Sequence, residues 1–226
     1  MNNKLKIFAV IELNSSEFTE YEYPYPNGSR MEFAEEWRLY WKKCLKDSDL
    51  VNLDQIIIGE PFVDISTISD EELKIIIHQQ LKDTNIDDVE EILSFKGGVA
   101  VSYDGVNITP QCCTSINDFE DWQKIIEEKP KGWQQIWIGH PWIFSRFKDN
   151  NIEFSDYVET NDYSKSARIF IDFISFQTAF MAMLKSIETF RIRIECILKQ
   201  EGYKNPSRIA TCLVNKVNFN EPDIEK

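Results

Sequence analysis

Apolar and polar residues alternate with a period of two at several places along the chain, and this pattern predicts β-strands. Every second residue from Leu5 to Leu13 is apolar, so these side chains would share one face of a strand. The same alternation recurs over 167–173. Shorter apolar segments predict further strands, namely a buried one at Ile56–Ile58, one at Trp133–Ile138 and a final one around Leu213, Val217 and Phe219.

Residues that tolerate a positive φ predict two hairpins. Asp104-Gly105 separates the extended runs 99–103 and 106–108, and an Asp-Gly pair between such runs is a strong hairpin signal. Asp149-Asn150-Asn151 is expected to turn 144–147 back onto 152–158.

Apolar residues three and four positions apart predict helices over about 31–46 and 175–201. The second of these has one long apolar stripe and is expected to end at Gly202. The run Ser69-Asp70-Glu71-Glu72 has the acidic composition of a first helical turn and predicts a helix to about Lys82. Two shorter helices are predicted over 86–94 and over a run to about 128 that is capped by Ser115 or Asn117.

Hairpins and helices are mixed along the chain without a regular βαβ alternation. This order predicts the α+β class, as a mixed, largely antiparallel sheet with packed helices, including a long C-terminal helix. The sequence contains no internal repeat, linker or low-complexity segment. Residues 1–226 are therefore expected to form a single globular domain.

The composition is typical of a globular protein with a substantial core, since 42% of the residues are apolar and 28% are charged. No apolar run approaches the length of a transmembrane helix, and the N-terminal segment is not followed by a signal-peptide cleavage site. Five cysteines, without disulfide-scaffold spacing, suit a reducing compartment. These features together predict a cytoplasmic protein without a membrane partner.

The net charge of −13 is concentrated in the first half of the chain. Residues 1–110 carry 21 acidic and 10 basic side chains, a net −11, whereas residues 111–226 carry 17 and 15, a net −2. This balance argues against nucleic acid as a ligand, because phosphate binding requires a basic surface. It favours either a solvated acidic surface or a basic protein partner bound through acidic residues such as Asp87, Asp88, Glu90 and Glu91.

Cys112, Cys113 and His140 lie in one segment and suggest either a metal site or a nucleophile. Zinc needs about four converging ligands, and adjacent cysteines without a second pair do not supply them, so no metal is expected. A cysteine nucleophile would use His140 as its base, oriented by Asp118, Asp156 or Glu159. The alternative interpretation is structural, because free cysteine commonly fills space in a core.

Carboxylates in the same region suggest a second catalytic hypothesis. Asp104, Asp156 and Glu159 would serve glycoside hydrolysis if the fold brought a pair of them together. Glycine-rich phosphate loops and serine nucleophile elbows are both missing from the sequence, and no cofactor is expected.

Aromatic residues concentrate in the same part of the chain. Trp133, Trp137 and Trp142 lie along a predicted strand and its exit, with Tyr157 further on. Strand parity places Gln135 on the same face as Trp137, which is unfavourable for a buried face. Trp137 and Trp142 are therefore candidates for a partner-binding surface, although tryptophan also fills cores.

The segment 96–159 resembles the immunity proteins of bacterial polymorphic toxin systems. The resemblance rests on Gly97-Gly98, Asp104-Gly105, Pro110, Cys112-Cys113, Asp118, Trp122, Trp137, Gly139-His140-Pro141 and the run 152–159. It covers a little over a quarter of the chain. It implies a small, intracellular, often acidic protein that blocks the active site of a cognate toxin, but it assigns no binding residues.

Two hypotheses of different classes follow. The first is a non-catalytic intracellular binding protein, such as an immunity protein that neutralises a basic toxin by direct contact. The second is a small cysteine- or carboxylate-dependent hydrolase that uses residues 104–159. An open pocket holding both Cys113 and His140 would favour the hydrolase, whereas a convex acidic face without a pocket would favour the binding protein.

Overall fold

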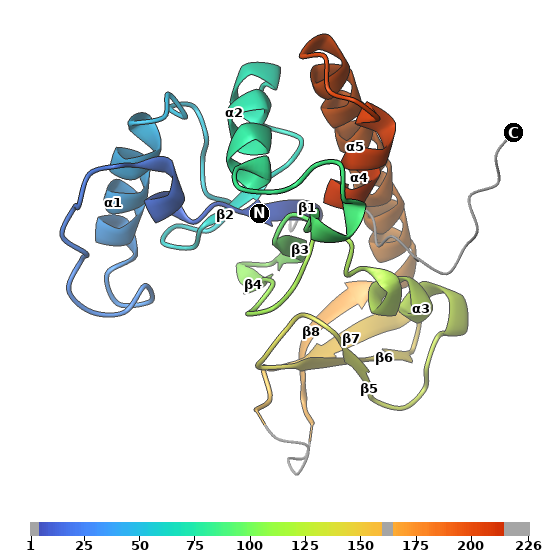
Figure 1. Ribbon diagram of the computed structural model, residues 1–226. Helices are drawn as coiled ribbons and strands as arrows, with labels where there is room; N and C mark the ends of the chain where they lie inside the picture. The colour runs from blue at the N-terminus through green and yellow to red at the C-terminus, as the bar shows by residue number, and fades with distance from the viewer. Residues whose placement is uncertain (1–4, 160–164, 215–226) are drawn as a thin grey trace, which may run out of the picture.

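The computed structural model describes residues 5–159 and 165–214, and it folds them into two four-stranded antiparallel sheets and five α-helices (Figure 1). The fold is α+β, as the sequence predicts. The first sheet has the strand order β2-β1-β3-β4. Its strands are β1 Lys6–Glu12, β2 Phe62–Asp64, β3 Gly97–Tyr103 and β4 Val106–Ile108.

The second sheet follows chain order, β5-β6-β7-β8. Its strands are β5 Gln134–Ile136, β6 Ile143–Lys148, β7 Asn151–Ser155 and β8 Ala167–Asp172. Both predicted hairpins are present, one in each sheet, as β3–β4 and β6–β7. Asp104 and Gly105 have φ values of 51° and 76°, and Asp149 and Asn150 have 49° and 60°. Two consecutive positive φ values are what a two-residue hairpin turn of the favoured type requires.

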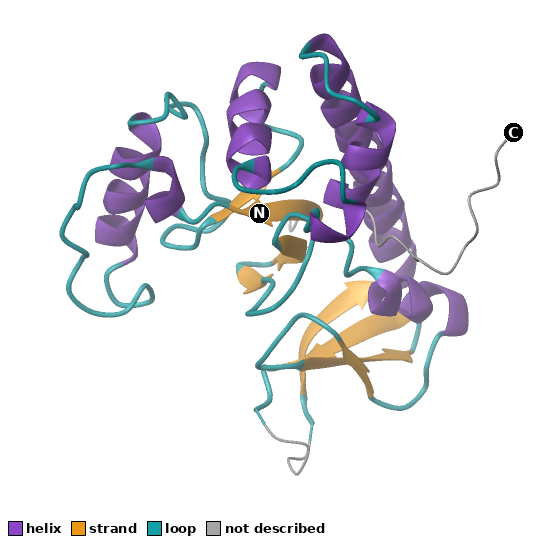
Figure 2. Cartoon of the chain, in the orientation of Figure 1, coloured by secondary structure: helices purple, strands orange, loops and turns teal. Residues whose placement is uncertain are grey.

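The helices gather mainly on the side of the first sheet, while the second sheet lies at the opposite end of the molecule (Figure 2). Their bounds are α1 Ala34–Lys46, α2 Asp70–Leu81, α3 Glu120–Glu128, α4 Phe173–Gln200 and α5 Pro206–Val214, with short 3-10 helices η1 Ser15–Phe18 and η2 Val89–Glu91. The predicted start of α2 is confirmed. The Ser69 hydroxyl accepts from the Glu72 amide at 3.2 Å, and the Glu72 carboxylate accepts from the Ser69 amide at 3.1 Å, a reciprocal capping box.

Helix α4 connects the two sheets. It packs against β1 and α2 and also against β7 and β8. Its buried residues follow the predicted stripe, which the structure extends to Phe173, whereas Leu184 of the predicted stripe is only half-buried. The buried residues are Phe173, Phe176, Phe180, Met183, Ile187, Phe190, Ile194, Ile197 and Leu198. Buried side chains from both sheets belong to one hydrophobic cluster that includes this stripe. The single-domain expectation for 1–226 stays a prediction.

Two predicted elements in the first half of the chain are wrong. Ile56–Ile58 forms turns rather than a buried strand, and Ile58 is 56% exposed; the strand that pairs with β1 begins at Phe62 instead. The predicted 86–94 helix shrinks to η2. There the Asp88 carboxylate accepts from the Glu90 amide at 3.0 Å, and such local side-chain bonds compete with helical ones.

Two predictions in the second half also differ from the structure. The helix expected from Ser115 or Asn117 begins only at Glu120, because the Asp118 carboxylate accepts from the Ser115 amide at 2.9 Å and holds a turn before it. Leu213 lies in α5 rather than in a final strand. The other residues of that predicted strand, Val217 and Phe219, fall outside the described residues.

Within residues 5–159 and 165–214, no helix combines the length and the apolar character needed to cross a membrane.

Candidate functional site

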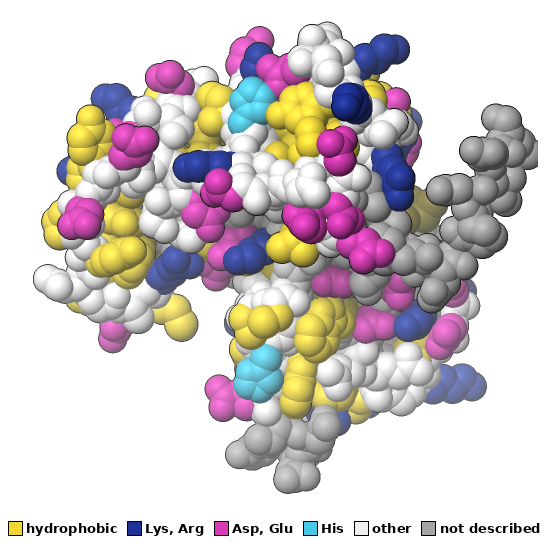
Figure 3. All heavy atoms as spheres, in the orientation of Figure 1, with side chains coloured by type: hydrophobic (Ala, Val, Ile, Leu, Met, Phe, Trp, Pro, Cys, Tyr) yellow, Lys and Arg dark blue, Asp and Glu magenta, His cyan; other side chains and the backbone are white. Residues whose placement is uncertain are grey.

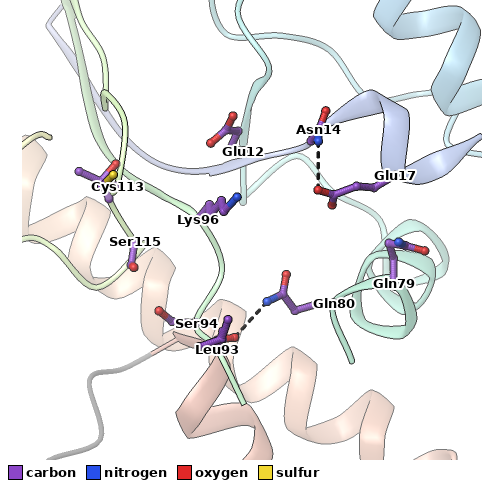
Figure 4. Close-up of a pocket in the computed structure, with 11 residues that line it drawn as sticks. Glu12, Asn14, Glu17, Gln79, Gln80, Leu93, Ser94, Lys96, Cys113 and Ser115 are labelled. Carbon is purple, nitrogen blue, oxygen red and sulfur yellow. Dashed lines mark hydrogen bonds between the residues drawn. The ribbon is translucent and has the colours of Figure 1, made fainter. Parts of the chain in front are cut away.

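A pocket of about 510 Å³ opens between the end of β1 and the last turn of α2 (Figure 4). Most of its lining residues are polar, and the segments that form it are far apart in the sequence. Its lining residues are Glu12, Asn14, Glu17, Gln79, Gln80, Leu93, Ser94, Lys96, Cys113, Thr114 and Ser115. The approach of the last turn of α2 to the end of β1, rather than any local motif, therefore creates the pocket.

Hydrogen bonds hold several of these groups in place. The Asn14 side-chain amide donates to Glu17 Oε1 at 3.0 Å, and the Gln80 side-chain amide donates to the Leu93 carbonyl at 3.0 Å. The Glu12 amide donates to the Lys96 carbonyl at 2.8 Å, which continues the β1–β3 pairing. The wall is thus formed before any ligand arrives, which reduces the entropic cost of binding.

The charges around the pocket are unequal. Glu12 and Glu17 contribute two carboxylates, whereas Lys96 contributes the one ammonium group of the lining. In Figure 4 the Lys96 amine extends into the space between these two carboxylates. The net charge of the lining is therefore −1, which favours a ligand group that is positively charged or zwitterionic.

An acidic segment adjoins this pocket. Gln80, in the last turn of α2, and Leu93 both line the pocket, so residues 81–92 form a connection that starts and ends at its wall. This connection carries the predicted partner-binding carboxylates Asp87, Asp88, Glu90 and Glu91, all of which are exposed. Figure 3 shows acidic side chains in a band across the middle of this face of the molecule. Their role in binding stays a prediction.

The four carboxylates of this segment differ in their local contacts. Asp88 accepts from the Glu90 amide at 3.0 Å, and Glu91 accepts from the Asn85 amide at 3.2 Å, so these two shape the connection. The side chains of Asp87 and Glu90 have no hydrogen bond or ion pair with any other described residue. Their charges are thus available to a partner.

Cys113 lies on the pocket wall, but its environment does not activate the thiol. The residue is exposed and has a φ of 66°. A hydrogen bond and a charge interaction with the neighbouring Cys112 thiol raise the pKa of Cys113, and nearby Lys96 only partly opposes this shift. A raised pKa leaves less of the reactive thiolate at neutral pH.

His140 and Cys112 pair through their backbones, whereas catalysis would require contact between the His140 ring and the thiol. Cys112 and His140 form an isolated antiparallel bridge, and the Cys112 thiol lies 3.5 Å from the His140 carbonyl oxygen. The His140 ring instead has its Nε2 3.4 Å from the Glu159 carbonyl oxygen and meets the Trp142 ring edge-on at 5.0 Å. Among the described residues, no hydrogen bond joins a cysteine thiol to this ring, and His140 does not line the pocket that holds Cys113.

The candidate carboxylates are divided between different places. Asp156 and Glu159 line a separate hollow of about 420 Å³ beside β7, and Asp156 is paired with Arg168 at 2.7 Å. Asp104 lies in the β3–β4 turn, and Asp118 bonds the backbone before α3. The structure therefore does not join Cys113 with His140 and an orienting carboxylate in one pocket.

The two candidate tryptophans differ in exposure. Trp137 is 41% exposed, and its neighbour Gln135 is also exposed, as strand parity predicts. Trp142 is half-buried, and its backbone pairs with Val158 in both directions, at 2.8 and 3.0 Å. Trp137 is therefore available on the surface, whereas the Trp142 ring contacts His140 and the Trp142 backbone pairs with Val158.

Sequence reasoning did not identify the pocket. Glu12, Glu17, Gln79, Gln80 and Lys96 come from segments that no pattern connects, so only the tertiary fold brings them together. The one local signal is the three-residue spacing of Asn14 and Glu17, which matches the side-chain bond across η1. Within the described parts of the chain, no group of three or more His, Cys, Asp or Glu side chains is arranged to hold a metal ion.

Comparison of the chain with profiles of known protein families, with curated proteins and with solved structures gives no significant match.

Proposed function

We propose that this chain is a non-catalytic binding protein for a basic protein partner, and that its role is that of a cytoplasmic immunity protein which neutralises a basic toxin by direct contact. The observation that carries the proposal is the exposed, unpaired carboxylate pair Asp87 and Glu90 on a connection that borders a negatively charged pocket. The resemblance of 96–159 to immunity-type proteins supports the choice of role.

Complementary charge explains how such a surface would act. Exposed carboxylates attract a basic partner over roughly one Debye length, about 8 Å at physiological ionic strength. The pocket then offers Glu12 and Glu17 to a basic side chain of that partner. Long-range attraction mainly raises the association rate, whereas the contacts in the pocket determine dissociation.

Reversing charge on the connection tests this proposal. The double variant Asp87→Lys with Glu90→Lys is expected to slow association with the product of the adjacent gene by about tenfold at low salt, because neither side chain has a hydrogen bond or ion pair with a described residue. The difference from wild type should shrink as salt screens the charges. Association and dissociation rates from surface plasmon resonance at low and high salt measure both effects.

The matched control changes the same charge elsewhere. Glu120 and Glu128 are exposed at the two ends of α3, and the double variant Glu120→Lys with Glu128→Lys should leave the association rate within about twofold of wild type. Equal slowing in both variants would mean that net charge alone matters. Absence of any complex with the adjacent gene product would overturn the immunity role.

A hydrolase remains a second candidate because Cys113 borders the same pocket as Glu12 and Glu17. The raised pKa of Cys113 leads to a clear expectation. Iodoacetamide should alkylate Cys113 no faster than the exposed Cys196 at neutral pH, since the thiolate is the attacking form. Peptide mass spectrometry over a time course measures both rates in one sample. Selective, rapid labelling of Cys113 would favour the hydrolase.

A further inference from the structure

An aromatic surface covers the outer side of α1, on the lobe that this helix forms with the loop 19–33. We call it the tyrosine face, and it consists of Tyr21, Tyr23, Tyr25, Trp37 and Tyr40. Tyr21 and Tyr25 are 66% and 65% exposed. Figure 3 shows apolar and acidic side chains side by side over this lobe. Exposed aromatic residues gathered in this way are typical of interaction sites.

The rings contact one another rather than projecting singly into solvent. Tyr25 lies 5.2 Å from Tyr40 and 6.1 Å from Trp37, and Trp37 meets Tyr40 edge-on at 5.9 Å. Tyr21 lies 5.9 Å from Tyr23. These centroid distances are those of favourable aromatic pairs. The tyrosine face thus consists of two ring clusters, Tyr21 with Tyr23 and Tyr25 with Trp37 and Tyr40.

Hydrogen bonds hold the loop against α1. The Trp37 indole donates to the Gly28 carbonyl at 3.2 Å, and the Tyr23 hydroxyl donates to the Asp47 carboxylate at 3.2 Å. Pro24 and Pro26 further restrict the backbone between them. A surface that is already ordered loses little conformational entropy when a partner binds.

The tyrosine face already binds cations of its own chain. The Arg30 guanidinium lies 5.2 Å from the centre of the Trp37 ring, and the Lys43 ammonium lies 3.8 Å from that of Tyr23. Tyr21 and Tyr25 have no such cation among the described residues. Their exposed faces are therefore open to an external cation.

Glutamates occur close to these rings along the chain, because Glu20 and Glu22 flank Tyr21 and Glu36 lies one helical turn before Tyr40. Glu20, Glu22 and Glu36 are exposed and have no hydrogen bond or ion pair with a described residue. A cation that stacks on Tyr21 would therefore also be attracted by the unpaired carboxylates of Glu20 and Glu22. The carboxylates and the aromatic rings thus both favour a cationic ligand group.

We propose that the tyrosine face is a docking surface for an arginine-bearing segment of a protein partner. Arginine is favoured over lysine because its planar guanidinium stacks on aromatic rings and donates to carboxylates at the same time. The proposal rests on the proposed function in one respect, namely that the partner is basic. It assigns a second contact area, on α1 and the 19–33 loop, apart from the pocket and the 81–92 connection.

A synthetic peptide of alternating arginine and glycine, with a lysine–glycine peptide for comparison, tests the proposal on the full chain. Fluorescence anisotropy of the labelled peptides should give tighter binding of the arginine peptide. The variant Tyr21→Ala with Tyr25→Ala should weaken its binding by about tenfold and remove the preference over lysine. Tyr21→Phe with Tyr25→Phe retains both rings and should bind like wild type. Circular dichroism verifies that each variant is folded.

Two further variants separate the possible outcomes. Phe170→Ala with Ile174→Ala removes two exposed apolar side chains from β8 and α4 and should leave peptide binding unchanged. If the tyrosine-to-alanine variant binds normally while Asp87→Lys with Glu90→Lys abolishes binding, the tyrosine face is not the docking surface, although the proposed function stands. Equal affinity of wild type for the arginine and lysine peptides would also overturn the proposal.

Discussion

Replacing Phe180 with alanine is expected to lower the free energy of unfolding by about 3–5 kcal/mol. Phe180 is 0% exposed in the first third of α4 and stacks on Phe176 at 6.0 Å. Phe176 contacts Phe154 of β7 at 5.7 Å, and Phe154 contacts Trp122 of α3 at the same distance. Truncation at Phe180 leaves a cavity in this aromatic chain, and urea unfolding followed by circular dichroism measures the loss.

The neighbouring residue on α4 provides the control. Met181 is 57% exposed, so Met181→Ala removes a side chain of comparable length without creating a cavity. Its effect on the free energy of unfolding should stay within about 0.5 kcal/mol. Similar losses in both variants would contradict the assignment of the α4 stripe to the core.

The parts of the fold that the sequence predicted are those controlled by neighbouring residues. The α4 stripe repeats over many turns, so its period is unambiguous. The Asp104-Gly105 turn and the acidic start of α2 depend on side chains and φ values within three or four residues. Local chemistry of this kind can be recognised without knowing the tertiary structure.

The secondary structure of short apolar segments could not be predicted from neighbouring residues. Ile56–Ile58 has the composition of a buried strand, but the β1 edge is occupied by Phe62–Asp64 instead. Leu213 belongs to a nine-residue helix that packs against α4 and η2. In both places tertiary packing decides between structures that the local sequence permits equally.

The candidate site was less predictable than the fold. Lys96 and Cys113 share a pocket with Glu12 and Gln80 because the first sheet and α2 meet there. Cys112 and His140 were expected to act together from their place in one segment, but their backbones pair and the His140 ring points to the Glu159 carbonyl. Proximity in the sequence therefore indicated a contact, but not which atoms make it.

Several unusual residues of 96–159 have structural roles. A Cβ at Gly97 would lie 2.0 Å from the Val10 carbonyl oxygen, so glycine permits the close pairing of β1 and β3. Trp122 is completely buried against Phe154. The Tyr157 hydroxyl accepts from the Thr109 amide at 3.0 Å and so links the end of β4 to the second sheet. The packing of this segment therefore explains these residues.

Gly139→Ala is expected to lower the free energy of unfolding by about 2–5 kcal/mol. Gly139 has a φ of 89°, a region that costs a residue with a Cβ about 1–2 kcal/mol. A Cβ there would also lie 2.1 Å from the Cys112 carbonyl oxygen and 2.9 Å from the Gln111 carbonyl carbon. These are backbone atoms, so relief of the clash must move the chain and disturb the Cys112–His140 bridge. Urea unfolding measures the change.

Gly105→Ala separates the two causes of this loss. Gly105 has a similar φ of 76°, but a Cβ there would meet nothing within 4 Å. The control should therefore lose only the backbone term of about 1–2 kcal/mol, and the excess at Gly139 reports the contact with Cys112. Equal losses at the two glycines would show that the 111–113 segment moves aside easily. In that case the close approach of Gly139 to the Cys112 carbonyl would not be needed to keep Cys112 beside His140.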